Sequence, residues 1–303
     1  MSSSAEGFQS NNLRVALRDA LGGKTAELER LLSALGAVVT AKPNFKLAAA
    51  FGVELSALPG TVAPLLRKFG GEDAAPDTNR AFLPIAAAHG WAGRVRAGRE
   101  VEVAWAALAE LAADERAAVR LGTLDALMSL AAHDNGMDDL LARATSWLDL
   151  EDRDIRFGAA ATVIEVFGQR RLFTTLRDHA GLLDYLSRVI AEIADAPRAA
   201  ERSEGRRRLL VGLPPTLVVV LGDGGEGVAA RQWFEVESAR ADHAAVRKIL
   251  SDTLVKLGPS GHGQSSAVIE EMRRSLEGSA KPLRDPTRLR PGTGRGKASR
   301  RTR

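Results

Sequence analysis

The chain of 303 residues contains no cysteine. It therefore has no disulfide framework, no thiol nucleophile and no thiolate ligand for a metal. Its five histidines are scattered, and none lies within one helical turn of another. The G-x-S-x-G elbow of serine hydrolases is also absent. From these absences we expect neither a bound metal nor another cofactor.

Long apolar runs are absent as well. The longest, at 209–221, is interrupted by Gly212, Pro214 and Pro215, whereas a membrane-spanning helix needs about 20 apolar residues. The first twenty residues lack the apolar core of a signal peptide. We therefore expect no membrane as a partner and a cytoplasmic location.

Aromatic residues are scarce, at 5% of a chain that is 45% hydrophobic. The core must then consist mainly of Ala, Leu and Val, which suits closely packed helices better than a β-sandwich. The charged fraction of 26% is that of an ordinary globular protein. The composition therefore predicts an all-α fold.

Positive charge is concentrated at the C-terminus. The whole chain has a net charge of +4, but residues 280–303 hold nine Lys or Arg and one acid, Asp285, a net of +8 that leaves −4 on the rest. The segment 279–303 has three prolines and almost no apolar residue, so we predict a disordered basic tail. Its cations are candidate nucleic-acid ligands: Lys281, Arg284, Arg288, Arg290, Arg295, Lys297, Arg300, Arg301 and Arg303. The alternative is a tail that only raises solubility.

The N-terminal part divides at its glycines and prolines. Residues 1–12 are rich in Ser and Asn and are predicted to be disordered. Helical pieces over 13–70 form a predicted N-terminal cap, and the polar stretch 70–80 is the best candidate for a linker. The main helical array is expected over 81–278.

A pattern recurs along the main array. An apolar helix leads to an acidic turn, and the second helix then opens with an aliphatic residue and an arginine. The turns and openings are Asp114 with Val119-Arg120, Asp152 with Ile155-Arg156, and Asp242 with Val246-Arg247. The first two arginines are 36 residues apart and the third follows after 91, which leaves room for one intervening unit. Two-helix units at such a period are typical of solenoids.

These motifs resemble the HEAT-like family of α-helical repeats over roughly 95–258. The resemblance implies a superhelix in which each hairpin buries its apolar side against the next, since one hairpin cannot bury it alone. Gly122 and Gly158 each follow a repeat arginine by two residues, where a small residue allows close helix approach. The unit around 170–221 departs from the pattern through a longer first helix and the Pro214-Pro215 pair.

The stretch GDGGEG at 222–227 matches G-x-G-x-x-G and follows a β-branched run. In a dinucleotide-binding fold such glycines bring the backbone close to a pyrophosphate. No other segment indicates a parallel strand, and Asp223 and Glu226 would place negative charge beside the phosphates. We therefore favour a loop after a buried, Val-rich helix over a nucleotide site.

The arginines have two interpretations. In the structural one, which we favour for the three repeat arginines, each pairs with the acidic turn of its own or the neighbouring repeat. In the functional one, they form a phosphate-binding stripe on the concave face together with Lys248, Arg206, Arg207 and Arg208. For the last three both interpretations stay open, because three adjacent arginines cannot all pair internally.

The four tryptophans, Trp91, Trp105, Trp147 and Trp233, raise an enzymatic alternative. Some HEAT-like proteins are DNA glycosylases that use aromatic side chains and an acidic residue in a basic concave groove. The acid there stabilises the positive charge that develops on the sugar. No residue here can be matched to that set, and a body charge of −4 disfavours a groove for duplex DNA. We favour tryptophans that fill gaps between helices.

We therefore predict an all-α, HEAT-like helical-hairpin solenoid (an α-α superhelix) with an N-terminal helical cap and a disordered basic tail. The function that we expect is that of a non-catalytic binding or scaffold protein. Its curved surface would bind a protein partner, and Arg206, Arg207, Arg208 and the tail would contact nucleic acid. The alternative is a HEAT-like DNA glycosylase that acts on alkylated bases.

Overall fold

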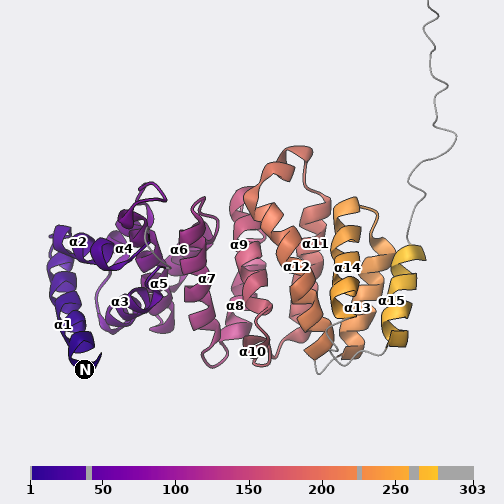
Figure 1. Cartoon of the computed structure of the whole chain (residues 1–303), viewed down its shortest axis with the longest axis horizontal. Helices are drawn as coiled ribbons and strands as arrows, with labels where there is room; N and C mark the ends of the chain where they lie inside the picture. The colour runs from indigo at the N-terminus through magenta and orange to yellow at the C-terminus, as the bar shows by residue number, and fades with distance from the viewer. Residues whose placement is uncertain (1, 39–42, 224–226, 259–265, 279–303) are drawn as a thin grey trace, which may run out of the picture.

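The computed structural model describes residues 2–38, 43–223, 227–258 and 266–278 (Figure 1). Within these ranges the chain forms fifteen α-helices, two 3-10 helices and no strand, which confirms the predicted all-α fold. None of these helices combines the length and the apolar content that crossing a bilayer requires. In chain order they are α1 (Ser2–Leu21), α2 (Ala26–Leu35), α3 (Phe45–Ala57), α4 (Ala63–Gly70), η1 (Asn79–Ala81), α5 (Phe82–Arg96), α6 (Val101–Ala112), α7 (Ala117–Ala131), α8 (Gly136–Trp147), α9 (Arg153–Phe167), α10 (Arg170–Phe173), α11 (His179–Ala194), η2 (Arg198–Arg202), α12 (Glu204–Asp223), α13 (Gly227–Arg240), α14 (Ala244–Leu257) and α15 (Ser266–Gly278).

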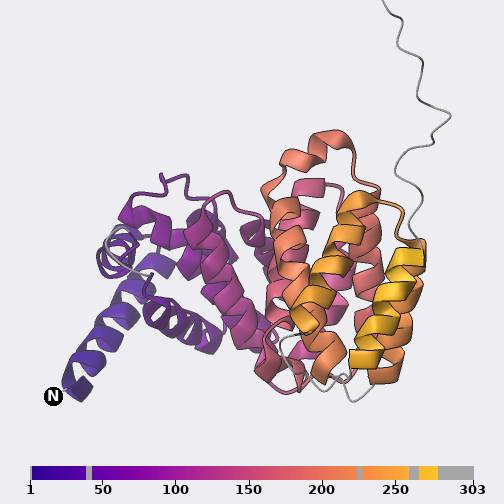
Figure 2. The same cartoon turned by 45° about the vertical axis from the view of Figure 1, so that its right-hand side comes forward.

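The helices stack in two layers along one direction, from α1 at one end to α15 at the other (Figures 1 and 2). In the layer that we name layer B, each helix packs on the next in the order α3, α5, α7, α9, α12 and α14. Layer A contains α4, α6, α8, α11, α13 and α15, which pack against the layer B helices. One hydrophobic core runs through both layers from α1 to α15. The structure is therefore a helical-hairpin solenoid, as the repeat pattern predicted.

Three hairpins lie where the repeat pattern placed them. They are α6–α7, α8–α9 and α13–α14, and their turns contain the predicted acidic residues Asp114, Asp152 and Asp242. The Asp152 side chain caps α9 by accepting from the N–H groups of Asp154 (2.8 Å) and Ile155 (3.2 Å). Such a cap satisfies donors that the first turn of a helix leaves unpaired. The intervening unit is α11–α12, with Pro214 and Pro215 inside α12.

Two helices of layer B are buried almost completely. Every residue of α5 from Phe82 to Arg94 is buried, as are Phe157–Ile164 of α9. The reason is that the helices on either side of each one contact each other. α3 contacts α7 across α5, and Arg120 of α7 reaches Glu204 of α12 across α9 (3.7 Å). Only α3, α7, α12 and α14 of layer B therefore present a broad surface to solvent.

Close packing in layer B depends on glycines. A Cβ atom on Gly122 would lie 2.6 Å from Cγ2 of Ile85, and one on Gly158 would lie 2.5 Å from Cα of Ala113. Real Cβ atoms do not approach other carbon atoms this closely, since interiors are close-packed. The predicted role of Gly122 and Gly158 in close helix approach is confirmed.

The N-terminal region differs from the sequence prediction in one respect. Residues 2–12, which their composition predicted to be disordered, belong to α1. The later turns of α1 bury Leu13, Ala16 and Leu17 against the core, and a helix that packing has nucleated extends at little cost. The polar stretch after α4 connects elements that share the same core. The tail 279–303 lies outside the described residues.

Candidate functional site

The repeat arginines close the turns of their own hairpins. Arg120, Arg156 and Arg247 each donate to the main-chain carbonyl six residues earlier, in the turn between the two helices. The structural interpretation of these arginines is therefore confirmed, although main-chain oxygens rather than acidic side chains are the main acceptors. The Asp114 carboxylate pairs instead with Arg116 (2.6 Å).

The three adjacent arginines at the start of α12 all have partners within the protein. Arg206 is buried, at 6% exposure, and donates to a main-chain carbonyl of α11 (3.4 Å). Arg207 is exposed and pairs with Glu204 in the same helix (2.7 Å). Arg208 pairs with Glu165 of α9 (2.7 Å). The premise that three neighbouring arginines cannot all pair internally is wrong, because successive residues of a helix point in different directions. Only Arg207 extends into solvent.

The remaining predicted nucleic-acid ligands lie outside the described residues. They are Lys281, Arg284, Arg288, Arg290, Arg295, Lys297, Arg300, Arg301 and Arg303. Residues 224–226 of the GDGGEG stretch are also outside the description, but the β-branched run before it is helical through Asp223. The strand that a dinucleotide site requires is therefore replaced by a helix, as we expected. Across the described residues, no three His, Cys, Asp or Glu side chains group as metal ligands.

Three of the four tryptophans are core residues. Trp91, Trp105 and Trp147 are buried, and the rings of Trp105 and Trp147 meet edge to face at 5.9 Å. Trp233 is partly buried, and its indole N–H donates to Oγ of Ser187 (2.8 Å). These positions support tryptophans that fill gaps between helices.

The helices of layer B that reach solvent each carry an exposed aliphatic side chain. Val53 on α3, Leu121 on α7, Val211 on α12 and Val255 on α14 are between 50% and 76% exposed. A single exposed aliphatic residue is ordinary, but here one recurs on every accessible helix of one layer. In layer A, the described residues show such side chains only on α13. We name these four residues the layer B aliphatic set.

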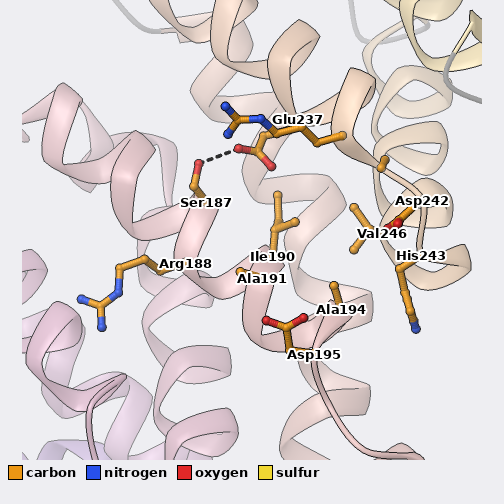
Figure 3. A pocket seen from close by; sticks show the side chains of 12 residues that line it. Ser187, Arg188, Ile190, Ala191, Ala194, Asp195, Glu237, Asp242, His243 and Val246 are labelled. Carbon is orange, nitrogen blue, oxygen red and sulfur yellow. Dashed lines mark hydrogen bonds between the residues drawn. The ribbon is translucent and has the colours of Figure 1, made fainter.

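A pocket of about 420 Å³ lies between α11 and the turn from α13 to α14 (Figure 3). We name it the α11–α13 pocket. Its walls are largely apolar and include Ile190, Ala194 and Val246. Figure 3 shows the side chains of Ser187, from α11, and Glu237, from α13, pointing toward each other at one end of the lining. The fold therefore places a carboxylate among aliphatic side chains.

Glu237 is buried, at 7% exposure, and one of its oxygens accepts a hydrogen bond from Oγ of Ser187 (2.8 Å). Ser187 in turn accepts from the indole of Trp233. The chain Trp233–Ser187–Glu237 orients the carboxylate at the pocket. Sequence reasoning missed Glu237. The signal that could have found it is an acid at a core position: Glu237 lies on the buried stripe of α13, where acids are rarely found.

Several charged residues line this pocket, and some of them already have partners within the protein. Asp195 and Asp242 add two carboxylates to its lining. Arg188 is already paired with a carboxylate in the turn that follows α8 (2.6 Å), and Arg240 is exposed at the rim. Nδ1 of His243 accepts the N–H of the second following residue (3.2 Å) and so caps α14. The pocket therefore has aliphatic walls and one buried carboxylate, with exposed side chains of both charges around it.

A second pocket, of about 640 Å³, lies between α4 and α6 in layer A. Its lining includes Leu66, Trp91 and Val103, with Glu102 and Glu110 among its carboxylates. Glu102 is engaged by an arginine of α8 (2.5 Å). Unlike Glu237, neither of these glutamates is buried.

The fold defines the class of this protein: it is an α-helical repeat protein whose hairpins stack in two layers. No protein-family model matches the chain, and no curated protein matches it. Among solved structures, a designed armadillo repeat protein is similar, with 16% identity over 82% of this chain and 100% of its own length, at a TM-score of 0.28. A likeness at this level carries no argument about ligands, so function is argued from the residues themselves.

Proposed function

We propose that this protein is a non-catalytic helical-repeat scaffold. On this proposal the accessible surface of layer B binds a protein partner, and the basic C-terminal segment adds affinity for nucleic acid.

The observation that carries the protein-binding part is the layer B aliphatic set. Exposed aliphatic side chains are usually scattered, whereas these recur on four successive accessible helices of one layer. Burying a half-exposed Val or Leu against a partner contributes about 1 kcal/mol each at roughly 25 cal/mol per Å². Polar residues such as Lys248 and Asp252 lie near this set on α14 and pair with each other (2.8 Å), which leaves the aliphatic residues available for contact.

A matched pair of variants tests this part. Leu121→Ser with Val211→Ser removes two members of the set, and Val228→Ser with Val236→Ser makes the same change on exposed positions of α13 in layer A. Surface changes of this kind alter stability by only about 0.5 kcal/mol. The measurement is the amount of partner protein that is cross-linked to the full-length chain in extracts of its source cells. This amount should fall at least tenfold with the first variant and stay unchanged with the second. Equal recovery with both variants would contradict the proposal.

The nucleic-acid part rests on charge. Residues 280–303 have a net charge of +8 against −4 for the rest of the chain, and Arg207 is the one exposed member of the arginine cluster on α12. Arg206 and Arg208 hold protein atoms and are left out of the proposal. Contact with about eight phosphates gives a log–log salt slope of roughly −7 for duplex DNA.

The test compares full-length protein with a variant in which all nine Lys and Arg of 280–303 are replaced by Gln. Duplex DNA binding is measured by titration from low to high salt. The slope of roughly −7 should disappear in the variant, because counterion release follows the number of neutralised phosphates. An unchanged slope would contradict a role for the tail. Release of alkylated bases by the purified protein would contradict the non-catalytic assignment.

A further inference from the structure

The α11–α13 pocket holds a carboxylate whose interactions are incomplete. Glu237 is more than nine-tenths buried, and its hydrogen bond from Ser187 engages only Oε1. Within the described residues no ion pair reaches it, and Arg240 at the rim is exposed. An ionised carboxylate in such surroundings is costly unless a cation or further donors accompany it. The site is therefore suited to an ammonium or guanidinium group.

The described chain ends close to this pocket. Nη2 of Arg247, at the start of α14, donates to the carbonyl of Leu276 in the last turn of α15 (3.0 Å). Ser275 donates to the carbonyl of Glu235 on α13 (3.5 Å). The C-terminal end of α15 thus lies against α13 and the first turn of α14, whose connecting turn lines the pocket. Figure 1 shows α13, α14 and α15 side by side at this end of the stack.

We propose that the α11–α13 pocket binds a cationic side chain of the C-terminal segment of the same chain, Lys281 or Arg284. These are the first cations after Gly278, three and six residues beyond it. An extended chain covers about 3.3–3.6 Å per residue, so six residues span about 20 Å. That length exceeds the diameter of one helix with its side chains, about 10–12 Å, and α13 and α14, which lie between α15 and α11, contact both of them.

The chemistry of the pocket fits such a side chain. The N–H groups of the cation donate to Oε2 of Glu237, while Ser187 keeps Oε1. Charge-assisted hydrogen bonds of this type are about twice as strong as neutral ones. The methylene groups of the side chain pack on Ala191, Ala194 and Val246. Because the segment is tethered, its effective concentration is in the millimolar range, so a weak intrinsic affinity is enough.

The proposal goes beyond the scaffold function and does not depend on it, because neither nucleic acid nor a protein partner takes part. The test uses the absence of cysteine. Ala199→Cys on η2 and Thr287→Cys in the tail introduce two thiols into the full-length chain for spin labels, and the distance between the labels is measured by pulsed electron paramagnetic resonance.

A bound tail gives a narrow distance peak. Glu237→Gln should lower the ratio of narrow to broad components about tenfold, equivalent to about 1.4 kcal/mol. Glu235→Gln makes the same change on α13 outside the pocket lining and should leave the ratio unchanged. Neutralising the tail side, through Lys281→Gln with Arg284→Gln, should reproduce the effect of Glu237→Gln without any change in the folded body.

Two results would overturn the proposal. One is a broad distribution already present in the chain that carries only the two labels. The other is a narrow peak that survives Glu237→Gln, whether or not the tail variant removes it, because the tail would then bind elsewhere. The nucleic-acid titration described above is a separate measurement, so failure of one idea leaves the other distinguishable.

Discussion

The buried guanidinium of Arg94 lies 2.8 Å from the carboxylate of Glu100. Arg94 also donates to the carbonyls of Leu58 and Gly60, just beyond α3 (2.8 Å each). Glu100 accepts from the N–H of Ala63 at the start of α4 (3.1 Å). One ion pair at the end of α5 thus satisfies main-chain groups at the end of α3 and the beginning of α4.

This arrangement predicts a large effect for Arg94→Ala. The substitution leaves a carboxylate and several carbonyl groups without their donor, and breaking such a buried pair costs about 3–5 kcal/mol. Arg67→Ala on the neighbouring α4 is the control, since Arg67 is exposed, and it should change stability by no more than about 0.5 kcal/mol. Urea unfolding of both variants measures the difference. Similar values for the two would show that the ion pair contributes little.

Because His89 is buried, we expect the protein to lose stability in mild acid. Burial, and secondarily the charge of Arg96, lower the pKa of His89 from 6.5 to about 4. Asp125 lies 3.5 Å from Nε2 but is itself 43% exposed, so burial dominates. The unfolded chain therefore binds the proton first, and stability is lost as the pH falls from 6.5 toward 4.

Between pH 7 and pH 5 this loss amounts to about 2 kcal/mol. His89→Leu removes the titrating group, so the difference in unfolding free energy between the two pH values should shrink by about that amount. Denaturant unfolding at both pH values provides the measurement. If the variant keeps the full difference, other groups cause the acid sensitivity.

Two glycines in adjacent layer B helices should respond to alanine in opposite directions. A Cβ on Gly158 of α9 would lie 2.5 Å from a main-chain atom of Ala113, whereas one on Gly212 of α12 meets its nearest atom at 3.6 Å. Gly158→Ala should destabilise the protein by about 1–3 kcal/mol through overpacking. Gly212→Ala should stabilise it by up to about 1 kcal/mol through helix propensity. Thermal unfolding that shows the same sign for both would argue against tight packing at Gly158.

The repeat arginines require a guanidinium rather than any cation. Arg156 donates through Nη1 to the carbonyls of Leu150 and Glu151 and through Nη2 to Glu192 (3.4 Å). A lysine has a single nitrogen and cannot cover both sides, so Arg156→Lys should cost about 1–2 kcal/mol. Arg153→Lys, at an exposed position in the same helix, is the matched control for urea unfolding. Equal midpoints for the two variants would contradict this role.

Local signals in the sequence located the hairpins. Acidic turns such as Asp152, aliphatic–arginine openings such as Ile155-Arg156, and Gly158 act on residues within a few positions or on the next repeat. They therefore predicted α8–α9 and the close approach of helices without any long-range information. The extent of α1 escaped prediction because packing of its later turns, rather than the Ser-rich composition of its start, decides whether it is helical.

The candidate site was harder to predict because its contacts join distant residues. Arg208 reaches Glu165, 43 residues away, and Ser187 reaches Glu237 across 50 residues. No repeat motif encodes contacts between residues so far apart. Charge composition alone therefore made the arginine cluster of α12 look available for binding nucleic acid. The buried stripe of α13 did mark Glu237 as unusual, but only the fold shows which residues surround it.

The complete burial of α5 has a consequence for how the molecule comes apart. Repeat proteins often fray from their ends, one unit after another. Here α5 cannot leave without exposing the faces of α3, α4, α6 and α7 that cover it. The first third of the chain should consequently unfold cooperatively, as one unit, while α15 at the opposite end can unfold on its own.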